Sequence, residues 1–225
     1  MAFGFNLQAS NGDIAFSTDY SSMSFVEKYT LYSSSATYVY NITCPSYPLV
    51  FIQDVENNED WGYCQGYLVD NGNNSYTFTV YATPELTISV YVFSYLNTNV
   101  PTTGYGINTF NSDGSLSFTS TKKILKISGY VVTTPYSGAE YYRDMLLDYG
   151  TLPTNCAIHI PSIGIFAGGT PFVNPVFNVG AKKINSTTIR LLRVRPPLGQ
   201  IPPNIPIYRN TGYQYVMAID SSLYD

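Results

Sequence analysis

Acidic side chains crowd one short stretch of the sequence, and these are the residues best suited to chemistry. The stretch is Asp54, Glu56, Glu59 and Asp60, followed directly by Trp61. Paired carboxylates serve as acid and base in glycoside hydrolysis, and Asp54 with Glu56 would be that pair. An acidic loop can also bind Ca²⁺, although this one lacks the spacing and the turn glycine of an EF-hand. We expect a solvated loop with no metal, no cofactor and no enzymatic activity; the hydrolase and the cation site are the alternatives.

The other reactive side chains form no catalytic or metal-binding motif. The only histidine, His159, sits in the alternating stretch 156–160 and is expected to be an ordinary strand residue. The three cysteines, Cys44, Cys64 and Cys156, are odd in number and include no CxxC pair. We therefore expect free, buried thiols, with a Cys44–Cys64 disulfide as the alternative.

Two features are better suited to binding than to chemistry. The chain has 22 Tyr and 12 Phe, more than two small cores can bury, so some tyrosines are expected to face solvent or a partner. The second feature is a proline-rich segment, which favours an extended, polyproline-like arm on a neighbouring subunit or a rigid loop between strands. The predicted contact residues are Trp61, Tyr63, Tyr67, Arg195, Pro196, Pro197, Pro202 and Pro203.

Charge is scarce and unevenly distributed along the 225 residues. Charged residues make up 12%, and the net charge of −4 divides into −9 over residues 1–121 and +5 over 122–225. The composition argues against disorder and coiled coil, and it favours an all-β protein. The basic residues are spread over many strands, so we expect no nucleic-acid site. The sequence has no long apolar run and opens without a leader, so we expect a protein with no transmembrane segment, made in the cytoplasm.

Short alternating segments bounded by turn residues predict the strands that must position these side chains. We expect two tandem β-sandwich-like domains, an acidic one at 1–100 and a basic one at 101–225 that carries the proline-rich arm. One helix is expected at 139–148, where Tyr142, Met145, Leu146 and Tyr149 follow helical spacing. The predicted strands are near 23–32, 36–43, 48–53, 63–69, 75–82, 86–96, 124–132, 156–166, 171–179, 184–194 and 206–220.

A motif near the start of the chain occurs again 102 residues later. Each copy reads aromatic-Gly-apolar-Asn, a spacer, Ser-Asn/Asp-Gly, and then apolar-x-Phe-Ser/Thr, from Phe3 to Ser17 and from Tyr105 to Thr119. Asn-Gly and Asp-Gly between alternating segments favour tight hairpins. We therefore expect hairpins pairing 2–9 with 14–18 and 104–111 with 115–120, and a duplication as their origin.

The repeated motif resembles the opening of small minor tail proteins of long-tailed bacteriophages. The residues that carry the resemblance are Met1–Phe5 with Ser10–Gly12 and Phe16–Ser17, and the second copy from Gly104 to Phe118. It covers about 50 residues, and Ser17-Thr18 and Thr119-Ser120 stand where Asp-Ser is commoner in that family. The resemblance implies a virion protein of the tail tip, assembled with other tail proteins or copies of itself. Binding to a host receptor or glycan is a further expectation, and a carbohydrate-binding module or lectin-like adhesin is the alternative.

Overall fold

A computed structural model describes the strands of the chain and part of its connections. The described residues are 6–8, 14–17, 22–33, 37–54, 64–81, 86–95, 106–110, 116–133, 142–159, 165–167, 176–194 and 214–225. Their regular structure is β-strand, apart from one short 3₁₀ turn, η1 (Ser221–Leu223). The all-β fold class predicted from the composition is confirmed.

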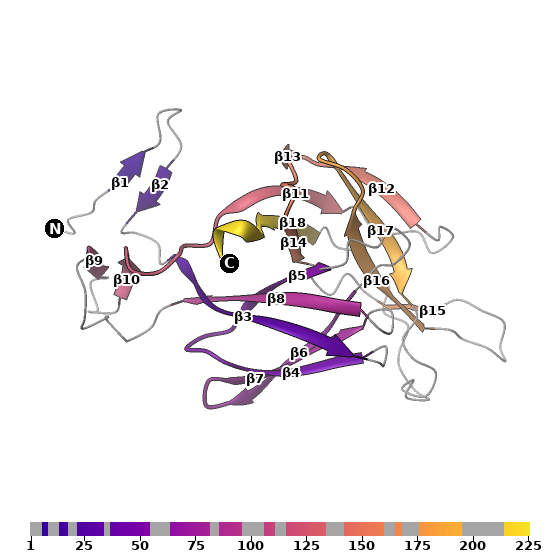
Figure 1. Cartoon of the computed structure of the whole chain (residues 1–225), viewed down its shortest axis with the longest axis horizontal. Helices are drawn as coiled ribbons and strands as arrows, with labels where there is room; N and C mark the ends of the chain where they lie inside the picture. The colour runs from indigo at the N-terminus through magenta and orange to yellow at the C-terminus, as the bar shows by residue number, and fades with distance from the viewer. Residues whose placement is uncertain are drawn as a thin grey trace.

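The largest element is an antiparallel sheet of seven strands in the order β13-β11-β18-β14-β5-β8-β3 (Figure 1). Valine, isoleucine and aromatic residues, which suit a pleated surface, fill its central strands. In chain order its strands are β3 (Met23–Ser33), β5 (Leu49–Asp54), β8 (Leu86–Tyr95), β11 (Ile127–Thr133), β13 (Tyr149–Gly150), β14 (Cys156–His159) and β18 (Gln214–Asp220).

Two smaller antiparallel sheets pack on one face of this large sheet. One has the order β4-β7-β6 and the other the order β12-β17-β16-β15. The first is built from β4 (Thr37–Thr43), β6 (Cys64–Gly72) and β7 (Ser75–Tyr81). The second is built from β12 (Tyr142–Leu146), β15 (Ile165–Ala167), β16 (Val176–Lys183) and β17 (Thr188–Val194). Side chains from all three sheets join in one core, among them Phe78, Val90 and Leu191.

The opposite face of the large sheet carries a second, mostly aromatic core. It contains Phe51, Tyr91 and Phe93 from β5 and β8, and it is covered by Tyr224 near the end of the chain. The Tyr224 ring lies 4.8 Å from the Phe93 ring, and its hydroxyl donates to Ile124 O at 2.9 Å. The central strands are thus buried on both faces, which explains why β5 and β8 are nearly continuous apolar runs rather than alternating ones.

The two predicted domains share this sheet. Strands β3, β5 and β8 come from 1–100, while β11, β13, β14 and β18 come from 101–225. The two groups meet where β5 pairs with β14, with Ile52 opposite Ile158. The main core also draws on both halves, so the boundary near residue 100 divides neither the sheet nor the core. Burial explains the merging, because each half alone would expose one apolar strand edge and part of the core.

Both copies of the repeated motif form two-stranded hairpins, as predicted. Strand β1 (Asn6–Gln8) pairs with β2 (Ile14–Ser17), and β9 (Asn108–Phe110) pairs with β10 (Leu116–Thr119). The paired residues correspond one to one, 102 positions apart: Asn6↔Ser17 matches Asn108↔Thr119, and Gln8↔Ile14 matches Phe110↔Leu116. The Asn-Gly and Asp-Gly turns themselves lie outside the described residues. Both hairpins lie on the same side of the molecule, apart from the three larger sheets (Figure 1).

The helix predicted at 139–148 is wrong, because residues 142–146 of this segment form strand β12. Pairing with β17 places Asp144 opposite Arg190, where carboxylate and guanidinium form a two-point ion pair of 2.5 and 2.8 Å. Met145 packs inward while Leu146 faces solvent, so alternation with a period of two governs this segment. The neighbouring strand overrides a local spacing that suits a helix.

Most other strands form within a few residues of their predicted places. The predicted strand 156–166 begins as β14 and ends in β15, which belongs to a different sheet, and residues 160–164 between them lie outside the described part of the chain. The turn between β6 and β7 lies at Asn73 and Asn74, with φ of 53° and 61°. Two consecutive positive φ angles between paired strands are the signature of a type I′ hairpin turn, and asparagine adopts them at low cost.

Replacing Gly150 by alanine is expected to destabilise the fold. Gly150 has φ of +75°, and a Cβ there would lie 2.0 Å from Ser128 O. The left-handed conformation alone costs an L-residue about 1–2 kcal/mol, and the clash with backbone adds to it. We expect Gly150→Ala to lower the free energy of unfolding by about 2–4 kcal/mol in urea titrations.

Gly72→Ala is the matched control for this measurement. Gly72 has φ of +77°, but a Cβ there would meet nothing within 4 Å. Its loss should be about 1 kcal/mol. Equal losses in the two variants would contradict the close approach of β11 and β13.

Removing the Tyr224 ring is expected to open the second core. Tyr224→Ala deletes the contacts with Phe25 and Phe93 and the hydrogen bond to Ile124 O. Loss of a buried aromatic side chain costs about 3–5 kcal/mol, and urea titration should show a loss of that size. Leu223→Ala, at a residue 45% exposed, should change stability by less than about 0.5 kcal/mol. A loss after Tyr224→Ala as small as this control would show that the end of the chain does not cover the core.

Candidate functional site

The residues predicted as contacts lie almost entirely outside the described part of the chain. Trp61, Tyr63 and the arm residues Arg195, Pro196, Pro197, Pro202 and Pro203 are all outside it. Tyr67 belongs to β6, but its side chain is not described. Asp54 ends β5, and the rest of the acidic stretch lies beyond it. These predictions therefore stay predictions.

The structure does bring together three tyrosines that the sequence scatters over 86 positions. Tyr130 in β11, Tyr149 in β13 and Tyr215 in β18 lie on one face of adjacent strands. The rings of Tyr130 and Tyr149 stack, with centroids 5.6 Å apart and planes inclined by 21°. Tyr215 meets Tyr130 edge to face at 5.7 Å. We call these three residues the tyrosine cluster.

The tyrosine cluster continues the second core into solvent. Tyr130 pairs with Met217, which packs against that core, so the cluster lies on the same face of the sheet. Beyond Met217 the rings are accessible to solvent. Tyr149 is 57% exposed and Tyr215 is 56% exposed, while Tyr130 between them is half-buried. A row of aromatic rings that stays exposed at the end of a buried core is unusual and indicates a contact surface.

An acidic side chain closes the strand edge beside the cluster. The Asp148 carboxylate accepts a hydrogen bond from Val132 N at 2.6 Å, and Asp148 N donates to Tyr130 O at 3.0 Å. Strand β13 is only two residues long and ends at Gly150, whose positive φ turns the chain away. Among the described strands, this edge therefore offers short backbone pairing and a negative charge.

The sequence predicts that some tyrosines are exposed and names Tyr63 and Tyr67 as contacts, but it does not single out the three of the tyrosine cluster. The helical spacing places Tyr149 on the apolar stripe of a helix. Tyr130 and Tyr215 lie 85 positions apart, in predicted strands whose pairing the sequence does not reveal. The one local signal is the alternation in β11, where Tyr130 and Val132 flank the fully buried Val131. That pattern places Tyr130 on the opposite face without naming its neighbours.

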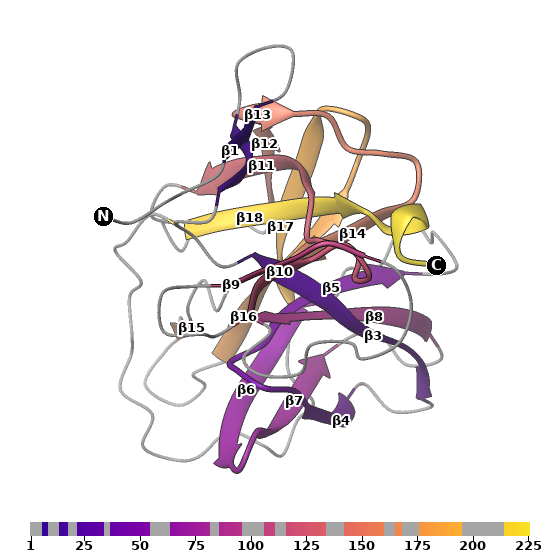
Figure 2. The ribbon, with the colours of Figure 1, turned by 90° about the vertical axis from the view of Figure 1, so that its left-hand side faces the viewer.

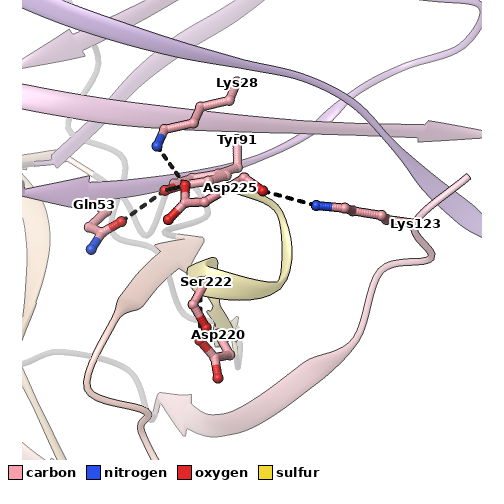
Figure 3. Close-up of polar contacts among 7 residues, drawn as sticks. All are labelled: Lys28, Gln53, Tyr91, Lys123, Asp220, Ser222 and Asp225. Carbon is pink, nitrogen blue, oxygen red and sulfur yellow. Dashed lines mark hydrogen bonds and ion pairs between the residues drawn. The ribbon is translucent and has the colours of Figure 1, made fainter.

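A second polar group of residues gathers where the end of the chain meets the large sheet (Figure 3). Lys28 Nζ lies 2.5 Å from Asp225 Oδ1 and 5.3 Å from the centre of the Tyr91 ring. The Tyr91 hydroxyl lies 3.0 Å from both Asp225 Oδ1 and Gln53 Oε1, two acceptors. Lys123 Nζ donates to the main-chain oxygen of Asp225 at 3.2 Å.

The ionisation of this group suits anchoring rather than proton transfer. The hydrogen bond from Lys28 lowers the pKa of Asp225, and the same bond raises the pKa of Lys28. Burial is the main cause that raises the pKa of Tyr91. At neutral pH the first two therefore stay charged and Tyr91 stays protonated, so these residues hold the chain end against the sheet.

His159 is confirmed as a strand residue and closes β14. Its Nδ1 lies 2.8 Å from Val50 O, and because a carbonyl only accepts, Nδ1 carries the proton of the neutral ring. The ring packs 5.6 Å from Phe51, and burial lowers its pKa. A neutral imidazole bound in this way links β14 to β5.

The described cysteines are free and buried, as predicted. These are Cys44 and Cys156, and burial raises the pKa of the Cys156 thiol to about 12. Cys44 follows Thr43, which pairs with Ser75, whereas Cys64 pairs with Tyr81 at the other end of β7. The length of β7 thus separates Cys44 from Cys64 by roughly 20 Å, which excludes a disulfide between them.

The described part of the chain has neither a metal-binding cluster nor a helix that could span a membrane. It contains no group of three or more His, Cys, Asp or Glu arranged to hold a metal ion. Within the same residues, no helix has the length and apolar character needed to cross a bilayer. Comparison with known proteins returned no match to a protein-family model, a curated protein or a solved structure.

The sole histidine gives a sharp test of the β14–β5 link. Because the folded state lowers the pKa of His159 below the ordinary 6.5, the unfolded chain binds the extra proton first. The contribution of neutral His159 to the free energy of unfolding is fully present above pH 6.5. It is lost as the pH falls below that value, by up to about 1.4 kcal/mol per pH unit. Urea titrations at pH 7.5, 6.5 and 5.5 should show this decline.

His159→Gln is the control, since glutamine keeps a donor for Val50 O and does not titrate. Its free energy of unfolding should change much less between pH 7.5 and 5.5. The same decline in wild type and variant would assign the effect to other groups.

Proposed function

We propose that this chain is a virion structural protein of a bacteriophage tail tip, which acts by binding neighbouring tail proteins or further copies of itself, with host-receptor adhesion as a second role. The observation that carries the proposal is the repeated hairpin. Its sequence resembles minor tail proteins, and both copies have the same strand pairing.

The second hairpin supports an assembly role through its exposed apolar side chains. Ile107 is 67% exposed and Phe110 is 49% exposed, and both lie on or beside β9. The backbone of Ile107 is held by Ser120, with Ile107 N to Ser120 Oγ at 2.8 Å and Ser120 N to Ile107 O at 2.9 Å. Two-stranded hairpins are marginally stable alone, so a partner that covers these side chains would stabilise the hairpin as it binds.

A carbohydrate-binding module is the second candidate function, and the tyrosine cluster is the observation that favours it. Exposed aromatic rings with hydroxyl groups are suited to sugars as well as to proteins. The two functions differ in where the chain is found. A tail protein is part of the particle, whereas an independent module binds glycans without one.

The assembly role is tested on purified particles from cells that produce this chain. Mass spectrometry should find the chain at a fixed copy number per particle, and immunogold labelling should place it at the tail tip. Ile107→Ser with Phe110→Ser should reduce its incorporation by about tenfold or more, because the partner loses apolar contacts.

The control for incorporation is Tyr32→Ser, which removes an exposed side chain from β3 in the large sheet. Its incorporation should match wild type. Particles that lack the chain altogether would overturn the proposal, and normal incorporation of the double variant would exclude the second hairpin as the contact.

A further inference from the structure

The tyrosine cluster has the geometry of a side-chain binding surface rather than of a strand-pairing edge. Its rings come from three neighbouring strands and are fixed against one another by stacking and edge-to-face contacts. The two outer rings, Tyr149 and Tyr215, are each more than half exposed. A rigid aromatic surface of this kind binds with little loss of side-chain entropy.

The edge next to the cluster narrows the choice of partner. Asp148 takes up Val132 N, a donor that an added strand would need, and β13 pairs through only two residues. A partner that adds a β-strand is therefore disfavoured here. Among the described residues, a partner at this place meets ring faces, phenol hydroxyls and the carboxylate of Asp148.

These groups select a ligand by its chemistry. The carboxylate of Asp148 repels phosphate and other anions and accepts hydrogen bonds from hydroxyl groups. Pyranose rings present C–H groups on their faces and hydroxyls around the rim, which complements aromatic faces flanked by polar atoms. An uncharged sugar offers its C–H faces to the rings and is not repelled by the carboxylate. An acidic polysaccharide also has such faces, but its negative charges are repelled by Asp148.

We propose that Tyr130, Tyr149 and Tyr215 form a binding platform for neutral carbohydrate. The proposal rests on the adhesive role under the proposed function and names its ligand class. Tyr149 and Tyr215 provide the exposed ring faces, and Tyr130 between them holds both rings in place. Asp148 at the rim accepts hydrogen bonds from sugar hydroxyls.

The experiment measures binding of the full chain to immobilised neutral oligosaccharides of glucose, galactose, mannose and N-acetylglucosamine. Polygalacturonate serves as the acidic comparison. We expect saturable binding to at least one neutral oligosaccharide and none to polygalacturonate. Tyr149→Ala and Tyr215→Ala should each weaken binding about tenfold or more, while Tyr149→Phe should keep most of it, because the ring face remains.

Tyr32→Ala is the matched control, since Tyr32 is 65% exposed on β3, at the opposite edge of the same sheet. Binding by this variant should equal that of wild type. Urea midpoints of all variants should stay close to wild type, because the replaced side chains are exposed. The proposal is overturned if the folded chain binds no neutral oligosaccharide up to about 10 mM, or if both alanine variants bind as wild type does.

This outcome is separable from the tail-tip assignment. Particles that contain the chain while the purified chain binds no sugar would remove the platform and keep the assembly role. Sugar binding by a chain that is missing from particles would keep the platform and remove the assembly role.

Discussion

The pairing of β5 with β14 is the contact on which the rest of the molecule depends. Ile52 and Ile158 face each other there, both fully buried, and through them three strands of the first half join four strands of the second. His159 adds a side-chain hydrogen bond to Val50 across the same junction. Because strands on both sides contribute to one core, loss of this junction would expose apolar surface of both halves at once.

Burial of the central strands on both faces follows from that junction. One face is covered by the two smaller sheets and the other by Tyr224 and the segment around Leu125. Figure 2 shows strands β4, β6 and β7 of one smaller sheet below strands β3, β5 and β8 of the large sheet. Strands buried on both faces leave few positions for charged side chains. Tyrosine provides polar groups at some of these buried positions instead. It fills apolar volume and still offers a hydroxyl, as Tyr91 and Tyr224 do within the second core.

The two surfaces to which we assign binding in the described part of the chain are physically different. The second hairpin exposes apolar side chains, Ile107 and Phe110, on a marginal two-stranded element. The tyrosine cluster exposes rigid rings on a seven-stranded sheet, beside a strand edge that Asp148 closes. The first suits assembly with proteins that cover it, and the second suits a ligand that contacts rings and hydroxyls. A tail-tip protein with an adhesive role would use both.

Much of the local structure could be predicted from the sequence alone. Alternation and turn residues identified the all-β class, most strands and both hairpins, because these depend on contacts between residues close in the chain. The pairing of β12 with β17, the merging of the two halves and the grouping of Tyr130, Tyr149 and Tyr215 were decided by the tertiary structure. Each depends on which distant strands become neighbours. Which strands become neighbours is decided by the burial of apolar surface and the pairing of backbone hydrogen bonds across the whole sheet. A short stretch of sequence therefore does not determine it.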